Sequence, residues 1–412
     1  MDNWKRTFAI IWSGQLFSTL SSSIVGYAVV FWLSIQTGSA EVLAYAMIAT
    51  LLPQLVLGLF TGVYIDRWNR KVTMILADSF IAICTAVLCV MFYMGKVEIW
   101  QIYIMLALRS VGSAFHMPAM QASIPLLAPE SQLMRISGIN QVIYSISNIA
   151  GPALAALLIT FMDMTYVLML DIGGAIIACI SLLFVTIPRP PKSGDSTEER
   201  NFVKEIKDGL KAIFYNRGMA WLFVCDVSAM FFIIPISALF PLMTLNHFMG
   251  NTYQMSLIET VWGVGMLLGG MFVGLNKMKN INKVLLIAGM CIVDGFMFLF
   301  TGLLSSEGFV FFAIFTAISG VAAAIWNSAF TVIMQTNIEA DKLGRAFSTY
   351  DSLMLMPSIP GLLATGFIAE AIGLANAFLF AGIGICVIGI IVLLVPSIKK
   401  LGEKELEKNT VN

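Results

Sequence analysis

The sequence predicts an all-α integral membrane protein, with twelve transmembrane helices arranged as two six-helix bundles. Three observations predict it: the apolar composition, the length of the apolar runs and the placement of the basic residues. Of the 412 residues, 58% are hydrophobic and 12% are charged, and the mean hydropathy is +0.88. A soluble core could not bury so much apolar surface, so a lipid bilayer is the expected solvent.

Twelve apolar runs are long enough to cross about 30 Å of hydrocarbon, which takes roughly 20 helical residues. The runs lack the strict alternation of membrane β-barrel strands and are rich in Leu, Ile, Ala, Met and Gly, so we expect helices. The expected spans are 8–35, 43–65, 72–95, 98–127, 136–161, 166–187, 218–245, 254–276, 283–304, 308–335, 344–369 and 373–396.

The basic residues fall almost entirely on one side of these spans. Only Lys96 lies on the other side, and Arg109 lies inside the fourth span. Because cytoplasmic loops are enriched in Lys and Arg, both termini are expected to be cytoplasmic. The first apolar run is too long for a signal-peptide core and has no cleavage site, so we expect it to be retained.

A single long hydrophilic stretch separates six spans from six. It predicts an N-terminal bundle at 1–187, a cytoplasmic linker with an amphipathic helix at 188–217, and a C-terminal bundle with a cytoplasmic tail at 218–412. Residues 57–72 share a pattern with 269–284, an offset of 212, and Leu133 and Leu343 begin a second match. Corresponding spans match, which indicates a parallel repeat of two halves.

Several function classes are excluded by what the chain lacks. The basic residues are spread over loops, so no nucleic-acid partner is expected. The six cysteines form no CxxC pair, and the two histidines lie on different spans, so neither a metal nor a cofactor is expected. The chain has no HExxH, GxSxG or P-loop motif, which argues against an enzyme and against ATP as the energy source. Proline and glycine breaks suited to rocking helices disfavour a channel.

The segment GVYIDRWNRK follows the second span and reads G-x-x-x-D-R-x-x-R-K. A topology signal would explain its cations but not the acidic residue at that spacing. The segment is similar to the loop signature of the major facilitator superfamily. This resemblance implies a latch between the two halves on the cytoplasmic side, closed in the outward-open state, made by Gly62, Asp66, Arg67, Arg70, Lys71 and, at the start of the eleventh span, Arg345.

The resemblance extends over nearly the whole chain. Segments such as NWKRTFAIIWSGQLFS, FHMPAMQASIPLLAPE and LGRAFS resemble the Mef-type macrolide efflux proteins among the drug:proton antiporters. This implies a transporter in the bacterial cytoplasmic membrane that exports bulky, macrolide-like hydrophobic drugs in exchange for protons by alternating access. Export of siderophores or another amphiphile, and lipid transport by the same fold, stay open. An ATP-binding-cassette partner protein also stays open; otherwise we expect a monomer.

Charged side chains inside a span cost about 2.5–3.5 kcal/mol each, so each needs a partner, water or a neutral form. The family architecture places Asp78, Asp171 and Asp294 on peripheral spans, where a structural hydrogen bond or a position near the headgroups is expected.

The candidates for proton coupling are Arg109, Glu259 and Asp226. For Arg109 the alternative is a static ion pair that fixes helix packing. A buried carboxyl group that holds either a proton or a cationic drug makes the two compete, which suffices for antiport. We rank Glu259 above Asp226 because an aromatic ring one turn away could stack on a cation.

Sites for bulky amphipathic molecules are apolar and aromatic with few polar groups. The expected substrate-binding residues are Trp12, Gln15, Phe115, His116, Gln141, Tyr144, Asn148, Phe231, Trp262, Trp326 and Asn327. Ordinary packing is the alternative for each aromatic residue. Helix–helix contact is the alternative for the polar stripe on the fifth span.

Overall fold

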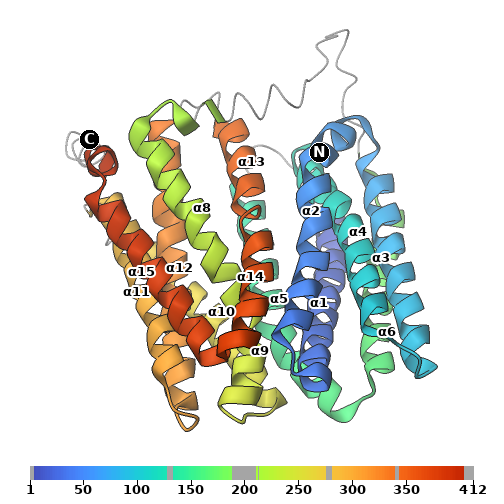
Figure 1. Cartoon of the computed structure of the whole chain (residues 1–412). Helices are drawn as coiled ribbons and strands as arrows, with labels where there is room; N and C mark the ends of the chain where they lie inside the picture. Colours follow the sequence, from blue (N-terminus) through green and yellow to red (C-terminus); the bar gives the residue numbers. More distant parts are fainter. Residues whose placement is uncertain are drawn as a thin grey trace. The chain divides into compact units, whose positions relative to one another are not determined.

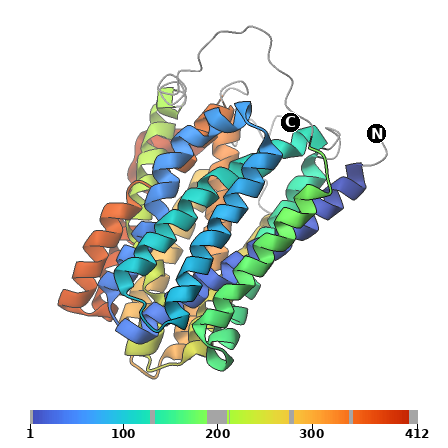
Figure 2. The same ribbon diagram turned by 90° about the vertical axis from the view of Figure 1, so that its right-hand side faces the viewer.

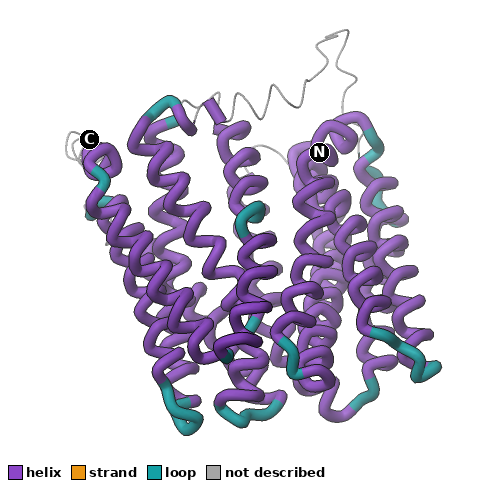
Figure 3. Tube along the Cα trace, viewed as in Figure 1, coloured by secondary structure: helices purple, strands orange, loops and turns teal. Residues whose placement is uncertain are grey.

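The structure is a computed structural model of the chain, and it describes residues 4–127, 133–187, 210–211, 213–274, 281–338 and 343–402. A few side chains within these ranges are also left undescribed. The described residues form helices joined by short turns, with no strand among them (Figure 3). The linker expected at 188–217 lies mostly outside the described residues.

Figure 1 labels the helices along the chain. In the first part of the chain they are α1 (Trp4–Thr37), α2 (Ala40–Arg67), α3 (Arg70–Tyr93), α4 (Ile99–Leu127), α5 (Leu133–Phe161) and α6 (Met164–Leu183). The second part contains α8 (Arg217–Ala238), α9 (Phe240–Leu242), the π-helix η2 (Met243–His247), α10 (Thr252–Gly274), α11 (Lys283–Leu303), α12 (Phe309–Asn337), α13 (Leu343–Met354), α14 (Ser358–Ile372) and α15 (Leu374–Leu394).

The chain folds into two compact units. Unit 1 is Met1–Gln36 with Tyr45–Arg200, and unit 2 is Thr37–Ala44 with Asn201–Asn412. Within unit 1, α3 packs most extensively against α4 and α6, and Figure 2 shows these three helices side by side. Within unit 2, α11 packs in the same way against α12 and α15.

Membrane crossing explains the helices, because backbone polar groups in hydrocarbon must be satisfied within their own segment. Nine helical segments of the described residues are long and apolar enough to cross a membrane, and Ser145–Phe161 and Ser358–Ile372 are shorter apolar segments. The all-α membrane fold is therefore confirmed. The count of twelve spans and the cytoplasmic placement of the termini stay predictions.

Asparagine caps begin the helices that follow the two similar loops. The Asn69 side chain accepts hydrogen bonds from the backbone N–H groups of Lys71 and Val72 at the start of α3. Asn282 caps α11 in the same way. Such caps satisfy N–H groups that a helix start leaves unpaired. The two caps are 213 positions apart, so the helix starts are displaced by one residue from the offset of 212 seen in the sequence.

Two of the expected spans are broken rather than continuous. The seventh, expected at 218–245, runs as α8 to Ala238 and continues as α9 and η2. The eleventh, expected at 344–369, is divided into α13 and α14 at Pro357. Proline lacks a backbone N–H and its ring crowds the preceding turn, so Pro241 and Pro357 account for the breaks.

Glycines bring α10 and α12 of unit 2 into backbone contact. A methyl group added at Gly265 would collide with the carbonyl oxygen of Ala317, and one at Gly320 would collide with that of Trp262. Small residues let membrane helices approach closely, and neither carbonyl can move without shifting its helix. Gly265 and Gly320 therefore lie in a close packing contact between α10 and α12.

We predict that Gly265→Ala lowers the free energy of unfolding by about 1–3 kcal/mol, because the new methyl group overpacks this contact. Gly270→Ala is the matched control on the same helix, since nothing lies within 4 Å of a methyl group placed there. Thermal unfolding of the purified, detergent-solubilised chain measures both. Equal unfolding temperatures for the two variants would contradict the contact.

Candidate functional site

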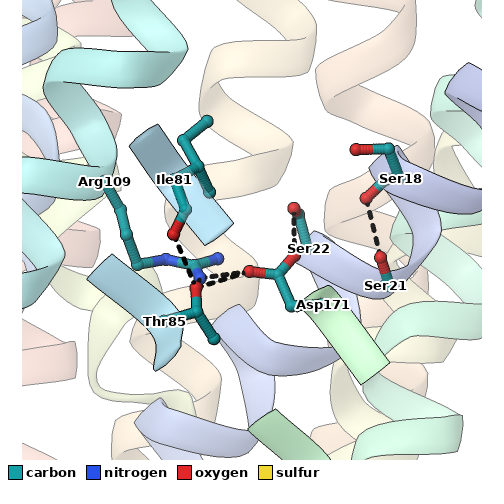
Figure 4. A network of polar contacts seen from close by, with 7 residues as sticks. All are labelled: Ser18, Ser21, Ser22, Ile81, Thr85, Arg109 and Asp171. Carbon is teal, nitrogen blue, oxygen red and sulfur yellow. Dashed lines mark hydrogen bonds and ion pairs between the residues drawn. The ribbon is translucent and has the colours of Figure 1, made fainter. Parts of the chain in front are cut away.

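The most connected polar site of unit 1 surrounds Arg109 on α4 (Figure 4). Its guanidinium forms an ion pair with Asp171 of α6 and donates to the Thr85 hydroxyl of α3. The Asp171 side chain is 1% exposed and that of Arg109 12%. The Ser22 hydroxyl of α1 donates to Asp171 Oδ1 at 2.6 Å, and the Thr85 Oγ1 lies 2.7 Å from Oδ2.

This network joins four helices through one buried carboxylate. An arginine keeps its proton under all physiological conditions, so its charge inside a bilayer needs a fixed counter-ion. Asp171 supplies that charge, and the two hydroxyls complete its hydrogen bonds. The contacts around Arg109 are those of the static ion pair that was the structural alternative for this residue.

Sequence analysis identified Arg109 but not its partner. Arg109 lies ten positions after the start of α4, Asp171 seven after the start of α6, and Thr85 eight before the end of α3. At about 1.5 Å per residue these depths agree to within one turn. A comparison of how deep each polar residue lies in its span would have paired Arg109 with Asp171. The ranking of spans as central or peripheral instead assigned Asp171 a structural role only.

In unit 2, Asp226 of α8 lies in an aromatic surrounding. Its carboxyl group is 3% exposed and accepts a hydrogen bond of 2.6 Å from the Tyr350 hydroxyl of α13. Trp326 of α12 lies beside the same carboxyl. The Tyr350 ring stacks on Phe330 at 4.6 Å and approaches Phe223 at 6.0 Å. The structure thus brings together Asp226 and Trp326, two of the expected site residues, and adds Tyr350, which sequence analysis missed.

The other expected coupling carboxyl, Glu259, is half-buried on α10, three positions before Trp262. The Trp262 side chain is also half-buried, and its backbone carbonyl faces Gly320 of α12. Glu259 and Trp262 thus lie about one turn apart on the same helix.

On α1, Trp12 and Gln15 differ in their surroundings. The Trp12 indole donates to Asn140 of α5, its ring stacks on Phe8 at 4.1 Å, and it belongs to a buried apolar cluster of unit 1. Gln15, one turn further on, is fully buried, and neither polar atom of its amide has a hydrogen-bond partner among the described residues. A buried amide without partners costs free energy, so Gln15 is the stronger candidate to bind a ligand or water.

The adjacent α4 residues Phe115 and His116 contact different neighbours. The Phe115 ring stacks on Trp68, which follows α2, with centroids 6.1 Å apart. His116 is buried, and its Nε2 lies 3.3 Å from Asp78 Oδ1 of α3. Sequence analysis expected His116 to line the substrate site and Asp78 to have a structural role. It did not anticipate that the two side chains would pair.

The remaining expected binding residues are scattered. Phe231 is half-buried beside Phe232 on α8, Asn148 is half-buried on α5, and Asn327 is exposed on α12. The side chains of Gln141 and Tyr144 lie outside the described residues. Among the residues that the structure does describe, no group of three or more His, Cys, Asp or Glu is placed to hold a metal ion.

The loop motif is described only in part, because the side chains of Gly62, Asp66, Arg67 and Arg345 lie outside the described residues. Arg70 donates to the carbonyl oxygen of Ala122 near the end of α4. Lys71 donates to the carbonyl oxygen of Val185 at 2.8 Å, just beyond α6. Both cations thus lie near the C-terminal ends of helices, where a positive charge is favourable.

We predict that Asp171→Asn and Arg109→Gln each lower the free energy of unfolding by about 3–5 kcal/mol, because either change leaves one buried charge without its partner. The double variant should unfold at a higher temperature than either single variant, since no lone charge is left. Asp163→Asn, at the exposed start of α6, is the matched control. Additive losses in the double variant would show that the two groups do not act as a pair.

Comparison with known proteins agrees with this arrangement of helices. The chain is 37% identical to macrolide efflux protein A of Streptococcus pyogenes over 407 residues, 98% of this chain and 99% of that one. The protein of the same name from Enterococcus faecalis is 37% identical over 329 residues, 79% of this chain and 100% of that one. The multidrug efflux pump Tap of Mycolicibacterium fortuitum is 23% identical over 392 residues, covering 90% of this chain and 91% of its own.

Solved structures share the fold at low identity. The nucleoside transporter NupG superposes with a TM-score of 0.70 at 13% identity, covering 95% of this chain and 98% of its own. A POT family transporter in complex with a thioalcohol-conjugated peptide gives a TM-score of 0.73 at 11% identity, with 94% and 96% covered. The model of the Major Facilitator Superfamily matches residues 11–359. The chain therefore belongs to the major facilitator superfamily.

Proposed function

We propose that this chain is a secondary transporter of the bacterial cytoplasmic membrane that exports macrolide-like hydrophobic drugs in exchange for protons by alternating access. The observation that carries the proposal is the 37% identity with macrolide efflux protein A of S. pyogenes along 98% of the chain. An identity that extends over both units supports a shared substrate class, because transporters of this fold bind between repeats.

The proton-exchange part of the proposal rests on Glu259 and Asp226 of unit 2. Charged carboxylates are costly in a membrane interior, and protonation removes that cost. Each group has aromatic neighbours, Trp262 near Glu259 and Trp326 with Tyr350 near Asp226. A group that alternately takes a proton or a cationic drug links the two binding equilibria, and this linkage drives one against the gradient of the other.

Arg109 has a different part in this proposal. Its ion pair with Asp171 and its contact with Thr85 bind α3, α4 and α6 together. We propose that it holds these helices as one moving body. For the loop 62–71 we retain the proposal of a cytoplasmic latch that includes Asp66, Arg67 and Arg345. The carbonyl contacts of Arg70 and Lys71 anchor the start of α3 beneath that loop.

We expect cells that express this chain to accumulate less of a labelled 14-membered macrolide than cells with an empty vector. A protonophore should restore accumulation to the vector level, because it collapses the gradient that drives exchange. A radiolabel uptake assay measures both. Low accumulation that persists with the protonophore would refute proton coupling and retain export. Accumulation equal to the vector control, with protein present at the membrane, would refute the substrate class.

Glu259→Gln and Asp226→Asn should each reduce the initial rate of macrolide export by at least about ten-fold, because the amide can no longer exchange a proton. Glu307→Gln is the control for the same chemical change at an exposed turn between α11 and α12. Export by everted vesicles under an imposed pH gradient gives the rates. A variant that exports at the wild-type rate removes that carboxyl group from the coupling step.

A further inference from the structure

We propose that Asp78 and His116 form a proton-binding site in unit 1, separate from the carboxyl groups of unit 2. The His116 Nε2 lies 3.3 Å from Asp78 Oδ1, and the two side chains are 10% and 4% exposed. A carboxylate and an imidazole at this separation can share one proton that either group holds. The ligand of the site is therefore a proton, delivered by water.

The hydrogen bonding of the pair is incomplete as it stands. Asp78 Oδ2 and His116 Nε2 are both buried without a hydrogen-bond partner among the described residues. Buried polar atoms without partners carry a desolvation cost. A proton held between His116 Nε2 and Asp78 Oδ1 would supply the bond that Nε2 lacks, and a water molecule would supply the bond that Oδ2 lacks.

The contact between Thr85 and Arg109 lies on the same two helices and differs chemically from the pair of Asp78 and His116. Thr85 lies seven positions after Asp78 on α3, and Arg109 lies seven positions before His116 on α4. Seven residues are two helical turns, roughly 10.5 Å along the helix. The contact at Arg109 contains a permanent positive charge, because a guanidinium does not release its proton. The contact with His116 instead involves an imidazole, a side chain that can exist with or without its second proton.

Other titratable or charged groups lie on α3 itself and on α2, α4, α5 and α6. From α6, Cys179 lies 3.8 Å from the Ser79 hydroxyl, next to Asp78, and Asp171 is held by Arg109 of α4. On α3 itself, Arg70 donates to the carbonyl oxygen of Ala122. At the ends of α2 and α5 stand Asp66, Arg67 and Arg135, whose side chains lie outside the described residues.

The protonation of this pair bears on the contact between α3 and α4. One turn before His116, Gly112 packs against Ile81 and Ala77, so the two helix backbones are close there. When the imidazole is protonated, it compensates the charge of Asp78, and when it is neutral, the carboxylate is left buried without a cation. The adjacent Phe115 stacks on Trp68, which lies between α2 and α3.

The test exploits the presence of two histidines in the whole chain. In a His247→Gln background, His116 is the one remaining imidazole. The full-length protein, labelled with ¹⁵N-histidine and placed in lipid nanodiscs, is titrated from pH 5 to 9 by NMR. Asp78→Asn is then added to this background, and Asp163→Asn serves as the matched control on the surface of unit 1.

The expected result is that the His116 signal converts between its singly and doubly protonated forms within this range. Asp78→Asn should move the midpoint by at least about one pH unit, and Asp163→Asn should leave it in place. A signal that keeps one protonation state throughout, or a midpoint unaffected by Asp78→Asn, overturns the proposal. If Asp78→Asn does not fold, Asp78→Ser takes its place with the same outcomes. No transport substrate is involved, so the result is independent of macrolide export.

Discussion

The absence of water in the bilayer core is the constraint on which the rest of this structure depends. It forces every backbone group into helical hydrogen bonds and requires each ionisable side chain to find a partner within the protein. Some of the polar contacts among the described residues therefore join different helices. Arg109 and Asp171, with Thr85 and Ser22, connect four helices of unit 1 in this way.

Along the interface of α3 and α4, this constraint has two chemically different solutions. Near Arg109 a permanent cation meets a carboxylate whose hydrogen bonds are complete, which suits a structural joint. Near His116 a titratable base meets a carboxylate with one unpaired oxygen, which suits proton exchange. In the two proposals made above, the first contact holds these helices together and the second takes up a proton.

Two carboxyl groups of unit 2, those of Asp226 and Glu259, have aromatic residues near them in space or along the helix. Asp226 has Tyr350 and Trp326 as neighbours, and Glu259 has Trp262 on its own helix. Rings provide apolar surface for a bulky drug and negative faces for a cation, while the carboxyl group provides the exchangeable charge. The described contacts of Arg109 in unit 1 are thus with a carboxylate and hydroxyl groups, whereas the Asp226 carboxyl of unit 2 lies beside aromatic side chains.

The sequence by itself determined the membrane class, the helical content and the family, because hydropathy and the loop motif are local properties of the chain. It also singled out Arg109, Asp226 and Glu259, since a charge within an apolar run is conspicuous.

Only the tertiary structure decided their partners. Asp171, Asp78 and Tyr350 lie 62, 38 and 124 positions from the groups they contact. The breaks at Pro241 and Pro357 were visible as prolines, but whether such a residue ends a helix depends on its surroundings. Pairing across helices is set by depth and rotation about each axis, which no local pattern specifies.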